Sequence, residues 1–133
     1  MRLFFDSNVL FTAAHNAKGK AALVIELAAE EGWELITSAF AVVEARRNLE
    51  LKRPASVGRL DELLEAFHPV VAPQPLTCPV DLPEKDRPIL AAAIRNRATH
   101  LLTGDLAHFG EFMGQPERAG GVDLCTVAEF LGA

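Results

Sequence analysis

The sequence has little cysteine and no long apolar run, and both shortages restrict the class of protein. Its two cysteines, Cys78 and Cys125, lie far apart and form neither a disulfide framework nor a CxxC metal site. We therefore expect reduced thiols in a cytoplasmic protein. No apolar stretch approaches the length of a membrane span. Asp6 interrupts the first one after LFF, so we expect neither a signal peptide nor a membrane association.

The chain also lacks an excess of basic residues. Its 13 Lys and Arg against 18 Asp and Glu give a formal net charge of −5 at pH 7. Proteins that bind nucleic acid usually carry a basic face, so this balance taken alone argues against such a partner. Carboxylates that gather around a cation also make a chain acidic, and the bound metal cancels part of their charge. The positions of the acids are therefore more informative than their sum.

Short apolar segments alternate with helical patterns along the 133 residues, half of which are hydrophobic. This length and composition predict a single globular domain, residues 1–133. Strands are predicted at 2–5, 33–36, 69–72, 100–103 and 122–125, and helices at 20–31, 38–51, 59–67, 87–98 and 126–131. The alternation indicates an α/β fold, three-layer α/β/α with a central, mainly parallel sheet of four to five strands. The proline-rich segment 73–85 predicts a long loop.

Acidic residues follow several of the predicted strands. Asp6 comes directly after the first strand, Asp105 comes after the strand at 100–103, and Asp86 begins a helix after the proline-rich loop. Glu44 lies one or two turns along the helix that follows the second strand. The carboxyl ends of parallel strands meet at one edge of a sheet, where ligands bind. We therefore expect all four acids near that edge.

Each acid alone also has a purely structural explanation. The three aspartates could cap helices or form turns, and Glu44 could pair with Arg47. Gathered together, however, like carboxylates repel one another and need a compensating cation. Hard divalent ions take oxygen ligands, so the pattern indicates a Mg²⁺ or Mn²⁺ site, with Ser7 and Asn8 hydrogen bonding to the acids or the ligand. No histidine pair has the HxxxH spacing, and we expect structural or surface roles for His15, His68, His100 and His108.

Four segments resemble the acidic motifs of the PIN domain: FFDSNVL, VVEARRNL, EKDRPILAAAI and LLTGDLAHF. The spacing and the intervening elements are similar across nearly the whole chain. The resemblance is greatest to compact bacterial and archaeal members that include the VapC-type toxins of toxin–antitoxin pairs. It implies a Mg²⁺- or Mn²⁺-dependent endoribonuclease whose catalytic and metal-site residues are Asp6, Glu44, Asp86 and Asp105. Thr103 lies where the family has a small hydroxyl residue beside the last acid.

The resemblance also has consequences for substrate and metal number. It implies hydrolysis of RNA phosphodiester bonds to a 5′-phosphate and a 3′-hydroxyl. Many members have a further acid shortly after the fourth, whereas this chain reads Leu106-Ala107-His108, so one or two metals remain open. Phosphates need cationic neighbours. The candidates after Glu44 are Arg46, Arg47, Lys52 and Arg53, for which a solvated helix face is the equal alternative.

Two other interpretations stay open. An aspartyl-phosphate module, receiver-like or dehalogenase-like, also places acids at strand ends, but the dehalogenase type needs an Asp where this chain has Asn8, and the receiver type needs a Lys where it has Thr126. A catalytically silent PIN-like interaction module would be favoured if one of the four acids were missing. The expected partners are an RNA substrate, a small antitoxin protein and a second copy of the chain. The homodimer is predicted from apolar residues in 38–67: Leu49, Leu51, Leu60, Leu63, Leu64 and Phe67.

Overall fold

Five parallel strands form one sheet in the computed structural model, which describes residues 1–132. They are β1 (Arg2–Phe5), β2 (Glu34–Ser38), β3 (His68–Val70), β4 (His100–Leu102) and β5 (Asp123–Cys125). The strand order is β3-β2-β1-β4-β5, and Phe4 of β1 pairs with Ile36 on one side and Leu101 on the other. The chain therefore winds outward in both directions from β1. The edge between β1 and β4 is the topological switch point at which such sheets bind ligands.

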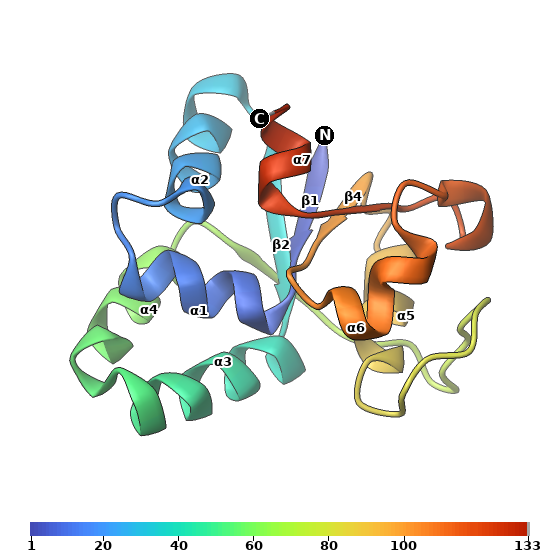
Figure 1. Ribbon diagram of the computed structural model, residues 1–133, viewed down its shortest axis with the longest axis horizontal. Coiled ribbons are helices and arrows are strands. Elements are labelled where there is room, and N and C mark those ends of the chain that lie inside the picture. The colour runs from blue at the N-terminus through green and yellow to red at the C-terminus, as the bar shows by residue number, and fades with distance from the viewer. Residues whose placement is uncertain (133) are drawn as a thin grey trace.

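Seven α-helices cover this sheet within the described residues. They are α1 (Ser7–His15), α2 (Lys20–Glu31), α3 (Ala39–Lys52), α4 (Val57–Leu64), α5 (Arg87–Arg95), α6 (Leu106–Phe109) and α7 (Val127–Leu131). In Figure 1, α1 to α4 lie to the left of the central strands, and α5 and α6 lie to the right. Helix α1 packs against α2, α3 and α4. The predicted three-layer α/β/α architecture with a parallel sheet is confirmed.

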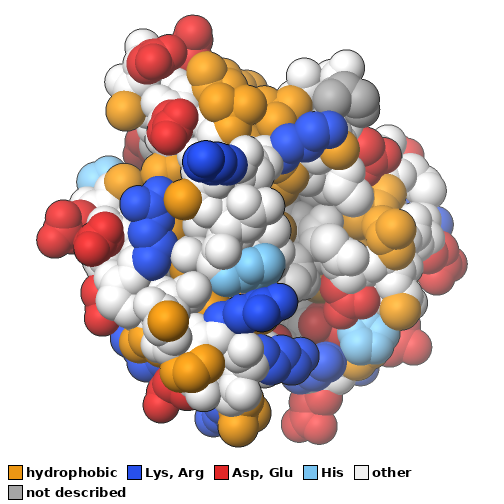
Figure 2. Space-filling view, turned by 60° about the vertical axis from the view of Figure 1, so that its left-hand side comes forward, with side chains coloured by type: hydrophobic (Ala, Val, Ile, Leu, Met, Phe, Trp, Pro, Cys, Tyr) orange, Lys and Arg blue, Asp and Glu red, His pale blue; other side chains and the backbone are white. Residues whose placement is uncertain are grey.

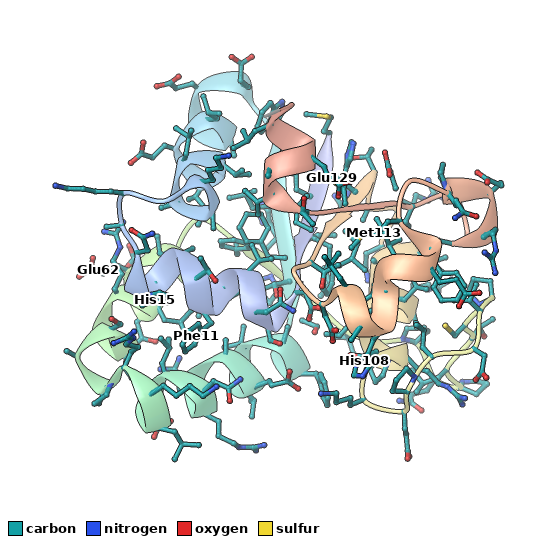
Figure 3. The ribbon with its side chains drawn as sticks, viewed as in Figure 1. Phe11, His15, Glu62, His108, Met113 and Glu129 are labelled. Atoms are coloured by element: carbon teal, nitrogen blue, oxygen red, sulfur yellow. The ribbon has the colours of Figure 1, made fainter. Side chains whose placement is uncertain are left out.

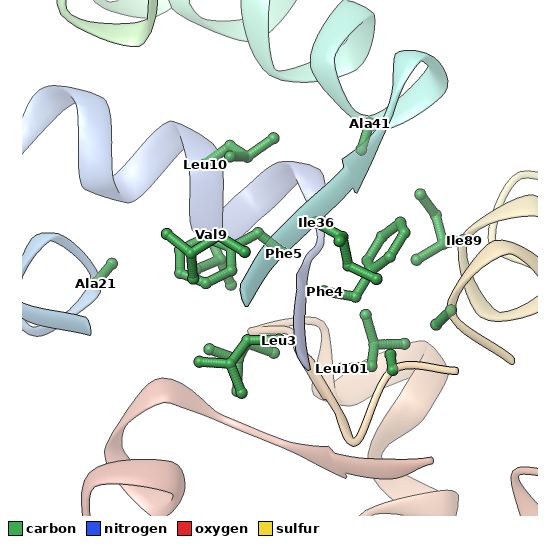
Figure 4. Close-up of a cluster of buried hydrophobic side chains, with 14 of the residues drawn as sticks. Leu3, Phe4, Phe5, Val9, Leu10, Ala21, Ile36, Ala41, Ile89 and Leu101 are labelled. Carbon is green, nitrogen blue, oxygen red and sulfur yellow. The ribbon is translucent and has the colours of Figure 1, made fainter. Parts of the chain in front are cut away.

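The core forms around β1, whose apolar side chains are buried on both faces of the sheet. Successive residues of a strand point to opposite faces. Phe4 accordingly lies with Ile89 and Leu101, whereas Phe5 lies with Val9 of α1 (Figure 4). Burying each phenylalanine stabilises the fold by roughly 1.5–3 kcal/mol. Because β1 is fixed from both sides, the residue that follows it is held firmly at the sheet edge.

The observed bounds differ from the predicted ones mainly at element ends. The strand at 2–5 and the helix at 20–31 have the predicted bounds. The helix predicted to reach residue 98 ends at Arg95, and Arg97 then takes a left-handed conformation with φ of 57°. Helix α1 was expected only as a segment that Asp6 could cap, and α6 was not expected. The proline-rich segment 73–85 contains no helix or strand, as predicted.

The two cysteines are free, as expected, and Cys125 is buried at the end of β5. Burial raises the pKa of its thiol to about 12, so this group stays protonated at neutral pH. Within residues 1–132, none of the helices has the length and apolar character needed to cross a bilayer.

Candidate functional site

Asp6 occupies the switch point as a buried carboxylate with all its neighbours in place. It caps α1 and is only 4% exposed. Its Oδ1 accepts a hydrogen bond from the Ser7 backbone N–H at 2.7 Å. Its Oδ2 accepts from Thr103 Oγ1 at 2.8 Å and from Asn8 Nδ2 at 3.1 Å. The residues predicted to hydrogen bond near the acids therefore do so around Asp6.

Ser7 connects Asp6 to the acid on α3. Its hydroxyl donates to Glu44 Oε1 at 2.7 Å and lies 3.5 Å from Asp6 Oδ1. Helix α3 begins at the end of β2, where Ser38 Oγ accepts from the Ala41 N–H at 3.2 Å. That cap fixes the first turn of α3, and Glu44 follows within the next turn. The expected approach of Glu44 to the sheet edge is therefore present.

Thr103 connects Asp6 to the acid after β4. Its fully buried hydroxyl donates to Asp6 and accepts from the Asp105 backbone N–H at 3.1 Å. Asn8 Oδ1 accepts from the Gly104 N–H at 2.7 Å, which ties the same turn to α1. Hydrogen bonds thus run without interruption from Glu44 through Ser7, Asp6 and Thr103 to Asp105.

Asp86 joins the group through a histidine. His108 Nδ1 lies 2.7 Å from Asp86 Oδ2 and 2.9 Å from Asp105 Oδ2. In Figure 3, His108 points from α6 toward the segment that leads into α5. The sequence predicted a structural or surface role for His108, and the structure places its imidazole among the acids. Asp86, Asp105 and His108 offer ligand atoms that all lie within 4.8 Å of one another.

The environment of the cluster disfavours negative charge. Burial raises the pKa of Asp6, and the nearby Asp86 and Glu44 carboxylates raise it further against the effect of its hydrogen bonds. Burial also raises the pKa of Asp86, with Asp105 adding to the effect and His108 opposing it. A cation bound here would relieve both the repulsion and part of the desolvation cost.

A groove of about 670 Å³ runs along this edge, and its lining includes both acidic and cationic side chains. Asn8, Thr12 and Asn16 face it from α1, at the four-residue spacing of one helix face. Lys20 and Lys85 also line it. Figure 2 shows acidic side chains and a histidine beside a hollow, with Lys and Arg side chains around it. Lys85 directly precedes Asp86 and Lys20 begins α2, but the sequence gives no sign that either lysine lines a groove.

The four residues predicted to bind RNA lie on and after α3. Arg46 donates to Asp61 at 2.7 Å, and Arg47, Lys52 and Arg53 are exposed. None of the four is part of the groove lining. Their role in binding RNA stays a prediction.

Several solved structures resemble the chain in fold. One chain of VapBC2 from Rickettsia felis, bound to a promoter DNA fragment, matches with a TM-score of 0.67 at 15% identity, over 95% of this chain and 98% of that one. One chain of VapBC-1 from nontypeable Haemophilus influenzae gives 0.61 at 14%, over 96% and 99%. One chain of FitAB bound to the IR36 DNA fragment gives 0.58 at 15%, over 94% of both chains.

These similarities establish the fold, and the sequence match establishes the family. None of the curated proteins compared with the chain matches it. Residues 2–107, however, match the PIN domain, and this stretch contains all four acids that meet at the sheet edge. The chain is therefore a member of the PIN domain family.

Proposed function

We propose that this protein is a metal-dependent ribonuclease that hydrolyses RNA phosphodiester bonds. Asp6, Glu44, Asp86 and Asp105 hold Mg²⁺ or Mn²⁺ in this proposal. Family membership supports a nuclease in general, and the arrangement of the acids supports the finer statement. The observation that carries it is the convergence of four carboxylates at the carboxyl ends of β1 and β4.

A buried acceptor without an aligned hydrogen bond supports a cation at this place. Asp86 is 6% exposed, and its Oδ2 lies 2.7 Å from His108 Nδ1 without forming a hydrogen bond of acceptable geometry. Leaving such an acceptor unsatisfied costs about 1–3 kcal/mol, and more when it is charged. Oxygen donors of this kind suit Mg²⁺ and Mn²⁺. When bound, such an ion lowers the pKa of a coordinated water and stabilises the charge that develops on the phosphate.

The chain's own residues orient these acids and the substrate. Thr103 and Asn8 fix the orientation of the Asp6 carboxylate, and Ser7 fixes that of Glu44. Lys20 and Lys85 would hold backbone phosphates of a strand lying in the groove. Arg46, Arg47, Lys52 and Arg53 would extend this contact beyond the groove, along α3.

The environment of Asp6 argues against an aspartyl-phosphate module. The dehalogenase type needs a second Asp two residues after the first, whereas this chain has Asn8 there, which donates to Asp6 Oδ2 at 3.1 Å. The receiver type needs a lysine at the end of the last strand, whereas this chain has Thr126 after β5, and the Thr126 side chain caps α7. The ribonuclease therefore remains the better supported activity.

The structural neighbours support a second part of the proposal, which concerns partners. One chain each of VapBC2, VapBC-1 and FitAB has this fold, and the sequence motifs resemble those of the VapC-type toxins of toxin–antitoxin pairs. We propose that the present chain is the toxin of such a pair, acts in the cytoplasm as a homodimer, and binds a small antitoxin protein. An antitoxin that covers the groove would also keep the acidic site away from cellular RNA.

The test is RNA cleavage with a matched acid control. Purified protein is incubated with structured and unstructured RNA and with single-stranded DNA, in Mg²⁺, in Mn²⁺ and in a chelator. We expect RNA cleavage only with metal, and at least about a hundredfold lower rate in Asp6→Asn. The control Glu26→Gln, which changes an exposed acid of α2, should cleave RNA at the wild-type rate. Metal-independent cleavage, or equal loss in both variants, would contradict the proposal. Metal binding without cleavage of any substrate would favour the silent interaction module.

A further inference from the structure

The imidazole of His108 is placed by the same turn that places Asp105. Asp105 caps α6, and its Oδ1 accepts from the His108 backbone N–H at 3.2 Å. The two side chains are three residues apart and therefore lie on the same side of this short helix. Their remaining polar atoms, Asp105 Oδ2 and His108 Nδ1, are 2.9 Å apart. Backbone geometry thus brings an oxygen and a nitrogen to one point.

Asp86 reaches that point from a different segment and for no structural purpose of its own. It stands at the N-cap of α5, yet its side chain caps nothing there. The carboxylate turns instead toward His108, with Oδ2 at 2.7 Å from Nδ1. Both atoms are buried, and neither has a hydrogen-bond partner of acceptable geometry. Two polar atoms at this distance that are not aligned for a hydrogen bond need another explanation.

A shared cation provides that explanation. Ligands about 2.1 Å from a metal and at right angles to each other are about 3.0 Å apart, close to the separations seen here. The partnerless Oδ2 of Asp86 is a second observation, independent of the clustering of acids, because an ion would satisfy it. We propose that His108 binds, through Nδ1 and together with Asp86 and Asp105, a divalent transition-metal ion, and that this site prefers Co²⁺ or Mn²⁺ to Mg²⁺.

The preference follows from ligand chemistry. Mg²⁺ is a hard ion that takes oxygen ligands and gains little from an imidazole nitrogen. First-row transition metals accept nitrogen readily, and their affinity for such sites rises from Mn²⁺ through Co²⁺ to Ni²⁺. The His108 nitrogen distinguishes this group of ligand atoms from an all-oxygen site. The biological use of the ion rests on the proposed nuclease function, whereas its identity does not.

The competing explanation is a simple ion pair. A protonated His108 between two carboxylates would neutralise part of their charge without any metal. The two explanations predict opposite effects of removing the ring. If His108 is a metal ligand, removing its ring weakens the binding of transition metals. If a protonated His108 competes with the metal for the carboxylates, removing its ring leaves that binding unchanged or strengthens it.

The decisive experiment measures metal binding, and not activity. Apo protein is titrated with Co²⁺, Mn²⁺ and Mg²⁺ by calorimetry, and Co²⁺ is also followed by visible absorption. We expect Co²⁺ to bind wild type at least about tenfold more tightly than Mg²⁺ does. His108→Ala should lose at least about tenfold in Co²⁺ affinity and less than about threefold in Mg²⁺ affinity. The control His68→Ala removes an exposed histidine of β3 and should match wild type.

A spectrum of the wild-type protein tests the same proposal without a variant, so the test does not depend on whether His108→Ala folds. In the wild type with Co²⁺, NMR should show a strongly shifted imidazole N–H resonance from a ligated histidine. If no such resonance appears, or if His108→Ala binds Co²⁺ as well as wild type does, the proposal is wrong. If Co²⁺ affinity does not depend on His108 while Mg²⁺ binds and supports RNA cleavage, only this proposal fails. If no divalent ion binds the wild type, the proposed function fails as well.

Discussion

Thr103 is the residue through which the two halves of the acid cluster are joined. Its buried hydroxyl donates to Asp6 and accepts from the Asp105 N–H. Thr103→Val keeps the shape but leaves the Asp105 N–H without its acceptor and Asp6 Oδ2 with only the hydrogen bond from Asn8, so we expect a loss of about 1–3 kcal/mol in the free energy of unfolding. The rate of RNA cleavage by Thr103→Val should also fall, because the Asp6 carboxylate loses a hydrogen bond that orients it. Thr103→Ser restores the hydroxyl and should behave like wild type in urea unfolding. A loss in Thr103→Ser as large as that in Thr103→Val would contradict a specific contribution of the hydroxyl.

Asp86 gives a prediction about pH in metal-free protein. Its pKa is raised above 3.8, chiefly by burial. The folded state therefore holds the proton more tightly than the unfolded state, and stability falls as pH rises from about 3.8 through the folded pKa. Asp86→Asn lacks this loss. In a chelator, the melting temperature of the variant minus that of wild type should increase from pH 4 to pH 7. A difference that shrinks over this range would mean that the ionised carboxylate is stabilised in the fold.

His108 illustrates which part of the site escapes sequence reasoning. The four acids could be found because each follows a strand or belongs to a recognisable motif. The histidine was missed because the search was for two histidines on one helix, whereas its neighbours are an aspartate at its own helix cap and another from the segment before α5. The spacing Asp105-x-x-His108 was the available signal. The approach of Asp86 depends on tertiary packing, which periodicity does not encode.

Among the elements, α3 has the most direct bearing on the site because it carries Glu44. Its cap is Ser38, whose hydroxyl accepts from the Ala41 N–H. Ser38→Ala should cost about 1 kcal/mol in the free energy of unfolding, measured in urea, whereas Ser38→Thr should cost much less. Ser56 precedes α4 without a side-chain cap bond, so Ser56→Ala serves as the control and should change little. A similar loss in Ser38→Ala and Ser56→Ala would show that the cap bond contributes nothing specific.

The same contrast between local and tertiary information explains the fold predictions. The strand 2–5 and the helix 20–31 were predicted with their observed bounds because their apolar patterns are strong. Helix α1 was not predicted as an element, since DSN favours turns as readily as helix starts. The sequence signal for this helix was the helical spacing of its apolar residues Val9, Leu10, Ala13 and Ala14, which are buried in the structure. The ends of the other predicted helices and strands differ from the observed ends by up to three residues. Tertiary packing determines the caps and left-handed turns at which these elements end.

For the whole molecule, bound metal should contribute directly to stability. An ion that binds only the folded state stabilises it by about 2.7 kcal/mol at a hundredfold excess over Kd. For a chain of this size that corresponds to a rise of roughly 10 °C in melting temperature. We expect wild type to melt higher in Mn²⁺ than in chelator, and Asp86→Asn and Asp105→Asn to lose most of the gain. An unchanged melting temperature throughout a millimolar titration would mean that the acids do not bind divalent ions.

The homodimer prediction has to be argued from different residues than those that suggested it. Leu49, Leu60, Leu63 and Phe67 are buried in the core of the single chain, so they are not surplus apolar surface. Only Leu51 of that set is strongly exposed, at 76%.

On the structure, the apolar surface that fits a second copy lies on one face of α3. Phe40 and Val43 are 42% and 55% exposed. Val43 and Leu51 follow Phe40 by three and eleven residues, which is close to whole numbers of helical turns, so all three lie on the same side of the helix. Wild type should be a dimer by light scattering at micromolar concentration, and Val43→Ser combined with Leu51→Ser should be a monomer. Val71→Ser removes an apolar residue beyond β3 that is even more exposed, at 82%, and should leave the dimer intact. A wild type that stays monomeric at tens of micromolar would refute the homodimer and leave this face free for the proposed antitoxin.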